Sequence, residues 1–147
     1  MFKKLLIAAG ITLTLVGCAS TVPMATPAKD AQAKQFVAKP DVAGVYVYRN
    51  EAFGKAVKLP LELDGKTIGQ TGYKTYFYTE VSPGPHKLTT RAENTTELTI
   101  DAIAGKLYFI WQEVKMGMWA PKAELHLVDE ATGKKGVNET NLANPVQ

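Results

Sequence analysis

The chain contains few of the side chains that most enzymes use for covalent or metal chemistry. Its 147 residues include one cysteine, two histidines and, after residue 40, one serine. The single cysteine, Cys18, excludes an internal disulfide bond. Ser82 precedes a proline, and no G-x-S-x-G motif surrounds it. The sequence therefore argues against a serine or cysteine hydrolase, and we expect a protein that is not an enzyme and has no cofactor and no metal.

The excess of basic over acidic residues is also small. The sequence carries 17 basic and 14 acidic residues, and without Lys3 and Lys4 of the N-terminal segment the net charge is +1. Nucleic-acid binding requires a clustered basic face, so we expect no nucleic-acid partner. Hydrophobic residues make up 46% and charged residues 21%, which is typical of one folded domain of ordinary size.

The longest apolar run is too short to cross a membrane. It covers residues 5–16, directly after Lys3 and Lys4. A transmembrane helix needs about 20 predominantly apolar residues. A positive start followed by a short apolar centre is instead typical of a secretory signal peptide.

The end of this run, Leu15-Val16-Gly17-Cys18, resembles the lipobox of bacterial lipoproteins. The resemblance implies cleavage between Gly17 and Cys18 and a diacylglycerol on the Cys18 sulfur, which makes membrane lipid a partner. Two or three acyl chains anchor a protein durably, whereas one chain binds only marginally. The alternative is an ordinary signal peptide with an incidental cysteine. Ala19 replaces the aspartate of inner-membrane lipoproteins, which resembles sorting to the outer membrane, facing the periplasm.

The chain divides into three parts. Residues 1–17 form the expected signal peptide. Residues 18–40 begin with the lipidated cysteine and are rich in alanine and proline, without a sustained period, which predicts a flexible tether. Residues 41–147 form the expected folded domain, ending in a loose tail from Asn138.

Strand patterns follow one another from residue 43 onward. Every second residue from Val57 to Leu63 is apolar, which indicates one buried and one exposed face. Pro60 lies within this segment and cannot donate a ladder hydrogen bond, so we expect an edge strand or a break. Residues 43–49 are apolar on both faces, as in a central strand. The expected strands cover residues 43–49, 57–64, 67–71, 75–81, 86–91, 97–101, 106–115 and 122–128.

Turn signals separate these strands. Asp64-Gly65 favours a hairpin, and Pro83-Gly84 is typical of a turn. Residues 129–136 indicate a turn or one short helix. Seven to eight closely spaced strands with no long amphipathic helix predict an all-β fold, an antiparallel β-sandwich.

The segment with the most unusual composition ends in Met116-Gly117-Met118-Trp119. Met118 and Trp119 are candidates for an exposed apolar surface that binds a partner or a sugar. Tyr48 and Arg49 extend this candidate surface if one sheet face is open, as do Tyr46, Tyr76 and Tyr78. If both sheet faces are covered, these residues pack in the core instead.

Two further candidate sites are weaker. Glu93 and Glu97 lie in or beside a loop, where carboxylates usually only solvate a surface. His86 and His126 are the two histidines, forty residues apart on polar sides of strand patterns. They are either exposed surface residues or, if they meet across a sheet near a carboxylate, ligands of a metal.

Six segments of the expected domain occur in this order: Val45–Asn50, Leu63–Lys66, Thr75–Phe77, Pro83–His86, Gly105–Phe109 and Gln112–Gly117. Together they resemble a family of bacterial lipoprotein domains of unknown function, DUF2846, and the Pro-Gly-x-His turn resembles small PEGA-type β-sandwiches. The resemblance implies a β-sandwich on an envelope lipoprotein and carries no activity. We therefore expect a non-catalytic binding or structural module, with an envelope protein or a glycan as partner. The alternatives are a glycan- or peptidoglycan-binding module and a metal-binding periplasmic protein.

Overall fold

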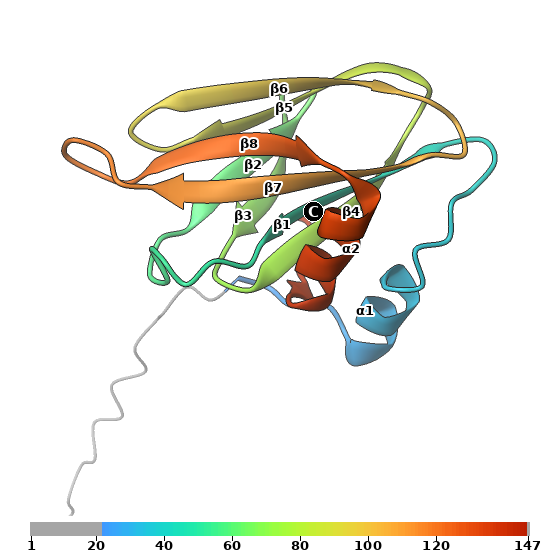
Figure 1. The fold of residues 1–147 in the computed structure, drawn as a ribbon, viewed down its shortest axis with the longest axis horizontal. Coiled ribbons are helices and arrows are strands. Elements are labelled where there is room, and N and C mark those ends of the chain that lie inside the picture. The colour runs from blue at the N-terminus through green and yellow to red at the C-terminus, as the bar shows by residue number, and fades with distance from the viewer. Residues whose placement is uncertain (1–21, 147) are drawn as a thin grey trace, which may run out of the picture.

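Alternating strands and the turns between them assemble into two sheets in the computed structural model, which describes residues 22–146. The elements in chain order are α1 (Pro27–Ala33), β1 (Ala43–Arg49), β2 (Leu59–Leu63), β3 (Lys66–Thr71), β4 (Thr75–Val81), β5 (Gly84–Arg91), β6 (Thr95–Ala102), β7 (Leu107–Lys115), β8 (Lys122–Val128), α2 (Glu130–Asn138) and β9 (Asn141–Leu142). One sheet has the order β8-β7-β1-β4-β9 and the other the order β3-β2-β5-β6. The two sheets face each other, and both helices lie outside the five-stranded sheet (Figure 1).

The predicted all-β sandwich is confirmed. The strand pairs are antiparallel except that β1 pairs with β7, and β4 with β9, in parallel. The first sheet is therefore mixed, because the chain crosses to the second sheet between β4 and β7 and returns beside β1. The signal peptide, Gly17 and Cys18 lie outside the described residues.

The main core lies between the sheets. Strand β1 contributes Val45 and Val47 to it, and both are buried because β1 is the central strand of its sheet. Burial of one such side chain contributes roughly 1.5–3 kcal/mol. The other large members of this core are Leu61, Phe77, Val81, Leu88, Ile100, Ile110 and Leu125.

A second, aromatic core covers the outer face of the five-stranded sheet. Tyr46, Tyr48 and Phe109 point to this face, and the helix α2 closes over them. Two glycines of α2 permit this contact: a Cβ at Gly133 would clash with Phe109, and a Cβ at Gly136 would clash with Tyr48. Both faces of β1 are thus covered.

The structure corrects the predicted tether for residues 22–40. This segment contains α1, which starts at Pro27 with Thr26 as its N-cap. Asp30 of α1 forms an ion pair with Lys34 (2.8 Å), and its other carboxylate oxygen accepts a hydrogen bond from the Leu142 amide (2.9 Å). The helix is therefore attached to the domain by contacts with residues more than a hundred positions away, which composition does not reveal.

The predicted loose tail is also wrong. Residues 141 and 142 form β9 beside β4, and Ala143 pairs with Met24 in an isolated bridge. The first and last parts of the described segment therefore meet at the β9 edge of the five-stranded sheet.

For the strand that contains Pro60, the sequence predicted either an edge position or a break, and the structure shows a break. Strand β2 is not an edge strand, since it lies between β3 and β5. It does contain a register shift between Leu61 and Glu62, and it pairs with β5 only from Leu61 onward, so Pro60 needs no ladder donor there. In the part of the chain that the structure describes, neither helix has the length and hydropathy to cross a bilayer.

Candidate functional site

The connection between β7 and β8 comprises residues 116–121, and we call it the β7–β8 tip. It exposes large apolar side chains to solvent. Met116 is 78% exposed, Met118 77% and Trp119 89%. The structure therefore places Met118 and Trp119 on the surface, as the sequence analysis expected. Exposed side chains of this size mark interaction surfaces when they lie together.

This tip is held in shape by Glu93, which lies in the connection between β5 and β6. Its carboxylate accepts hydrogen bonds from the amides of Met118 (3.1 Å), Trp119 (2.8 Å) and Ala120 (2.6 Å). The same amides, that of Ala120 foremost, lower the pKa of Glu93. A Cβ at position 117 would clash with the Ala120 carbonyl, so Gly117 is required for this backbone path. From its place in a loop, Glu93 was expected to be a solvated surface charge, and this role was not predicted.

Tyr48 and Arg49 are not part of an exposed surface, contrary to the sequence expectation. Tyr48 is 3% exposed and Arg49 is fully buried. Tyr48 and Arg49 are the last two residues of β1, and both faces of this strand are covered by other parts of the fold, so both side chains are buried. Burial raises the pKa of Tyr48 to about 12 and lowers the pKa of Arg49.

Arg49 instead shapes the connection between β1 and β2. Its guanidinium donates hydrogen bonds to the carbonyl oxygens of Val57 (2.5 Å) and Gly54, and its Nε lies 3.4 Å from Glu51 Oε1. Glu51 also accepts hydrogen bonds from Trp111 Nε1 (3.0 Å) and from the Val114 amide (3.1 Å). Glu51, which is 18% exposed and pairs with the fully buried Arg49, therefore ties residues 50–58 to β7 through its hydrogen bonds.

These connections lie together at one end of the sandwich, which we call the loop end. Strand β1 ends there, opposite the start of β4, and β7 runs parallel to β1 and ends there too. The left-hand side of Figure 1 shows the β5–β6 and β7–β8 connections at this end. The loop end comprises residues 50–58, 72–74, 92–94 and 116–121.

The tyrosines do not form an exposed platform. Tyr46 and Tyr76 are buried in the aromatic core, where the Tyr46 hydroxyl donates to the Ala33 carbonyl (2.7 Å). Tyr78 is half-buried and donates to Glu80 (3.1 Å). The candidate surface therefore consists of the β7–β8 tip, and its proposed extension over the tyrosines is wrong. A cavity of about 500 Å³ lies between α1 and this part of the sheet, where the hydroxyls of Tyr46 and Tyr78 already have these partners.

The two histidines do not meet. His86 lies on β5 in the second sheet, with Nδ1 2.6 Å from Asp64 Oδ2 and Nε2 2.8 Å from the Ser82 carbonyl oxygen. Two acceptors at its two ring nitrogens favour the protonated ring, and the Asp64 hydrogen bond raises the pKa of His86. His126 lies on β8 in the first sheet. The hypothesis of a metal site shared by both histidines is therefore wrong.

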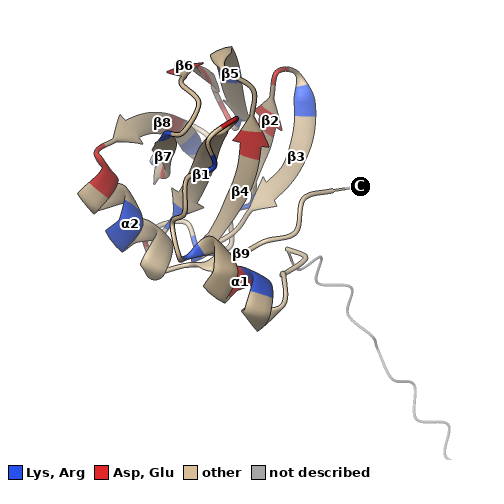
Figure 2. Cartoon of the chain, turned by 90° about the vertical axis from the view of Figure 1, so that its right-hand side faces the viewer, with Lys and Arg blue, Asp and Glu red and all other residues tan. Residues whose placement is uncertain are grey.

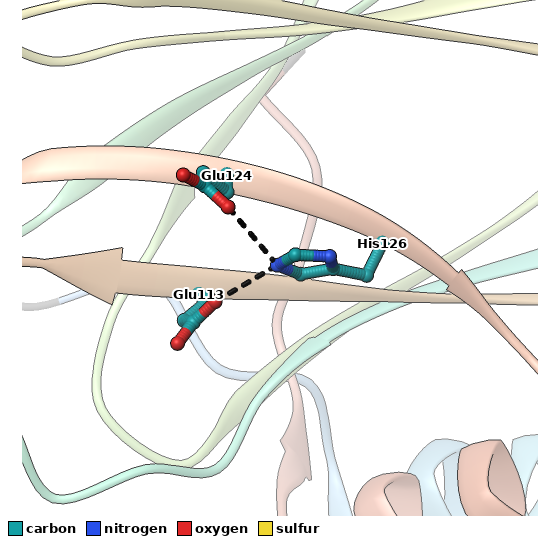
Figure 3. Close-up of side chains that lie close together, drawn as sticks. All are labelled: Glu113, Glu124 and His126. Carbon is teal, nitrogen blue, oxygen red and sulfur yellow. Dashed lines mark hydrogen bonds and ion pairs between the residues drawn. The ribbon is translucent and has the colours of Figure 1, made fainter.

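His126 belongs to a separate cluster on the outer face of β7 and β8 (Figure 3). Its Nε2 lies 2.8 Å from Glu113 and 3.5 Å from Glu124, and one ligand atom from each of the three falls within 4.8 Å of the others. This donor set suits zinc in kind. However, the Lys115 ammonium lies 3.4 Å and 2.8 Å from the same two carboxylates. The Lys115 ammonium thus already pairs with both carboxylates, and the cluster is best described as a surface ion-pair network.

Charge elsewhere is mixed as well. In the view of Figure 2, both basic and acidic segments occur on the strands and on the two helices. The expected lack of a nucleic-acid partner stays a prediction.

Comparison with known proteins agrees with this architecture. The model of the family described as "Protein of unknown function (DUF2846)" matches residues 39–125. An uncharacterized protein of Haemophilus influenzae is 39% identical over 136 residues, which cover 91% of this chain and 80% of that protein. No solved structure matches the chain. The matched region runs from before β1 into β8, so it includes the whole four-stranded sheet and strands β1, β4 and β7 of the other sheet. The chain therefore belongs to the DUF2846 family of proteins of unknown function.

Proposed function

We propose that this protein is a bacterial envelope lipoprotein whose β-sandwich acts as a non-catalytic binding or structural module. Acylated Cys18 anchors it, and the residue after the cysteine, Ala19, assigns it to the outer membrane with the domain facing the periplasm. The observation that carries the binding role is the β7–β8 tip, where Trp119 is 89% exposed on a backbone held by Glu93.

The lack of a catalytic arrangement around the described serine and histidines supports a non-enzymatic role. His86 lies beside Ser82 and Asp64, but its Nε2 contacts the Ser82 carbonyl oxygen rather than the hydroxyl. A histidine that donates from both nitrogens cannot accept a proton as a general base. His126 is engaged by two carboxylates. Neither histidine therefore activates a nucleophile here.

The anchor is tested by the Cys18→Ala variant in cells fed a clickable fatty-acid analogue. We expect loss of label from the protein and its release from the membrane fraction, since no other thiol can accept the lipid. A Ser20→Ala variant, next to the cleavage region, is the matched control and keeps both label and membrane location. Persistent labelling of the Cys18→Ala variant would refute the anchor.

A glycan-binding module is the second candidate, because an exposed tryptophan is the usual platform for stacking on a sugar. Burial of Tyr46, Tyr48 and Tyr76 leaves Trp119 as the ring available for it at this tip. Titration of the protein with soluble peptidoglycan fragments tests this candidate: a saturable change in emission that is lost in Trp119→Phe supports it.

A further inference from the structure

We infer that the loop end of the sandwich rests against the same lipid surface that holds the acyl chains of Cys18. This inference depends on the proposed lipid anchor and names the partner of the β7–β8 tip as the headgroup region of the anchoring leaflet. Three observations carry it: where the chain enters the domain, which side chains the loop end exposes, and how rigidly they are held.

The chain enters the domain at the loop end. Val22 packs beside Gly72, whose Cβ position would lie 3.1 Å from Val22 Cγ2. Gly72 belongs to the β3–β4 connection at the loop end. Cys18 precedes Val22 by four residues, and four residues reach about 14 Å at most. A lipid-bound Cys18 therefore keeps the membrane surface within a short distance of this end of the domain.

The connections of the loop end are in contact with one another. The Lys55 ammonium lies over the Tyr73 ring, 4.9 Å from its centroid. In the same connection as Lys55, Gly54 packs against Val114 near the end of β7. Residues 50–58 thus join the point where the chain enters to the strand that carries the β7–β8 tip.

The side chains exposed at the loop end are those that suit a lipid headgroup region. Phe53 is 46% exposed and adds to the three apolar side chains of the β7–β8 tip. Tryptophan favours the membrane–water interface, and lysines near it are attracted by anionic headgroups. The exposed lysines of the loop end are Lys55 and Lys74, and the exposed Lys122 begins β8 directly after it.

The acidic side chains of the loop end are engaged by groups of the protein itself. Glu51 forms an ion pair with Arg49 and accepts hydrogen bonds from Trp111 Nε1 and the Val114 amide. Glu93 accepts three amides of the β7–β8 tip. These contacts reduce repulsion from anionic lipid and also fix the tip before contact, so little conformational entropy is lost on docking.

The test uses the full lipidated protein, reconstituted into vesicles of phosphatidylcholine and phosphatidylglycerol with or without brominated acyl chains. Flotation reports the anchor, and quenching of tryptophan emission by bromine reports contact with lipid. Trp119→Phe leaves Trp111 as the remaining tryptophan, so the difference between the two proteins isolates Trp119. We expect floated wild-type protein to lose emission in brominated vesicles and Trp119→Phe to lose clearly less.

A charge-matched pair of variants sharpens the test. Lys55→Gln with Lys74→Gln removes two cations from the loop end, and Lys66→Gln with Lys106→Gln removes two exposed cations from the opposite end. We expect only the first pair to reduce quenching, and only in vesicles that contain phosphatidylglycerol.

The outcomes separate the anchor from the contact. Protein that floats without any quenching of Trp119 overturns the lipid contact and leaves the anchor intact. Protein that does not float overturns the anchor and the inference with it. A change in Trp119 emission with peptidoglycan sacculi but not with brominated vesicles favours the glycan candidate and also overturns the lipid contact.

Discussion

The two ends of the sandwich use carboxylates in the same way but differ in what their tips expose. The opposite end, which we call the hairpin end, comprises residues 64–65, 82–83 and 103–106. There, Asp64 accepts a hydrogen bond from the Lys87 amide (2.9 Å) and contacts His86. At the loop end, Glu51 accepts a hydrogen bond from the Val114 amide of β7, and Glu93 accepts hydrogen bonds from amides of the β7–β8 connection. Both ends are therefore ordered by charge-assisted hydrogen bonds to backbone.

The difference lies in the side chains at the tips. Among described residues, the hairpin end has one large exposed apolar side chain, Ile103, at 57% exposure. Its β2–β3 turn has only two residues between paired positions, Asp64 at φ 51° and Gly65 at φ 78°. The loop end has longer connections and four exposed large apolar side chains. An ordered end that exposes little apolar surface only closes the sandwich. An ordered end that exposes several large apolar side chains also provides a surface for contact with a partner.

The largest effect is expected from Glu51→Ala at the loop end. This change leaves the buried Arg49 guanidinium without its counter-ion and removes the acceptor for Trp111 Nε1. Breaking such a pair costs about 3 kcal/mol of unfolding free energy. Urea unfolding checks it. Glu51→Gln, which keeps an acceptor oxygen, is the matched variant with a smaller loss, and an unchanged midpoint in Glu51→Ala contradicts the role given to this pair.

At the hairpin end, Asp64→Asn has a smaller effect that depends on pH. Asp64 raises the pKa of His86 above 6.5, so this contribution is fully present below pH 6.5 and is lost as pH rises through the raised value. His86 in turn lowers the pKa of Asp64 below 3.8, so the contribution is also lost in acid, as pH falls through that lowered value. We expect Asp64→Asn to cost about 0.2–1 kcal/mol near pH 5.5 and less at pH 9, the scale of a partly exposed pair.

Urea midpoints of wild type and Asp64→Asn at these two pH values measure the difference. Asn tolerates the positive φ at this position, so the backbone of the turn is preserved in the variant. Equal losses at both pH values would show that the hairpin end depends on the hydrogen bond alone and not on the charge of His86.

Glu93→Gln separates local order from global stability at the loop end. We expect faster amide hydrogen exchange at Met118, Trp119 and Ala120, because each donates to this carboxylate. The urea midpoint should stay nearly unchanged, since the tip packs little apolar surface. The Lys87 amide, which donates to Asp64 of the hairpin end, serves as the internal control. Unaltered exchange at all three tip amides would contradict the role given to Glu93.

The smallest change in stability is expected from Trp119→Ala. A side chain that is 89% exposed contributes little to folding, and surface substitutions usually change unfolding free energy by less than about 0.5 kcal/mol. Ile103→Ala at the hairpin end is the matched control. A large loss in Trp119→Ala, measured by urea unfolding, would mean that the tip belongs to the fold and is not a free surface.

The strands were the most predictable part of the fold. Residues 43–49, 75–81 and 122–128 are strands with the predicted bounds. Period-two alternation determines which residues can share a face, and Asp64-Gly65 determines where a chain can reverse. The helix α1 was missed although Thr26-Pro27 is a recognisable helix start, because seven residues form a stable helix only when tertiary contacts hold them.

The candidate site was only half predictable. Met118 and Trp119 were placed correctly because an apolar sequence around a glycine, after a long strand, suggests a loop. Arg49 was misplaced although residues 43–49 already indicated a central strand, which implies that side chains on both faces are enclosed. Glu93 carried no sequence signal, since a carboxylate in a loop looks the same whether it meets water or the amides of another connection.

By itself, the sequence determined the all-β class, the strand order along the chain and the absence of an internal disulfide. These properties depend on the period of apolar residues, on turn chemistry and on the cysteine count. Only the tertiary structure decided that both faces of β1 are covered, that residues 22–40 dock, and that the point where the chain enters lies at the same end as Trp119. Those features depend on contacts between residues far apart in the chain, and local patterns do not encode such contacts.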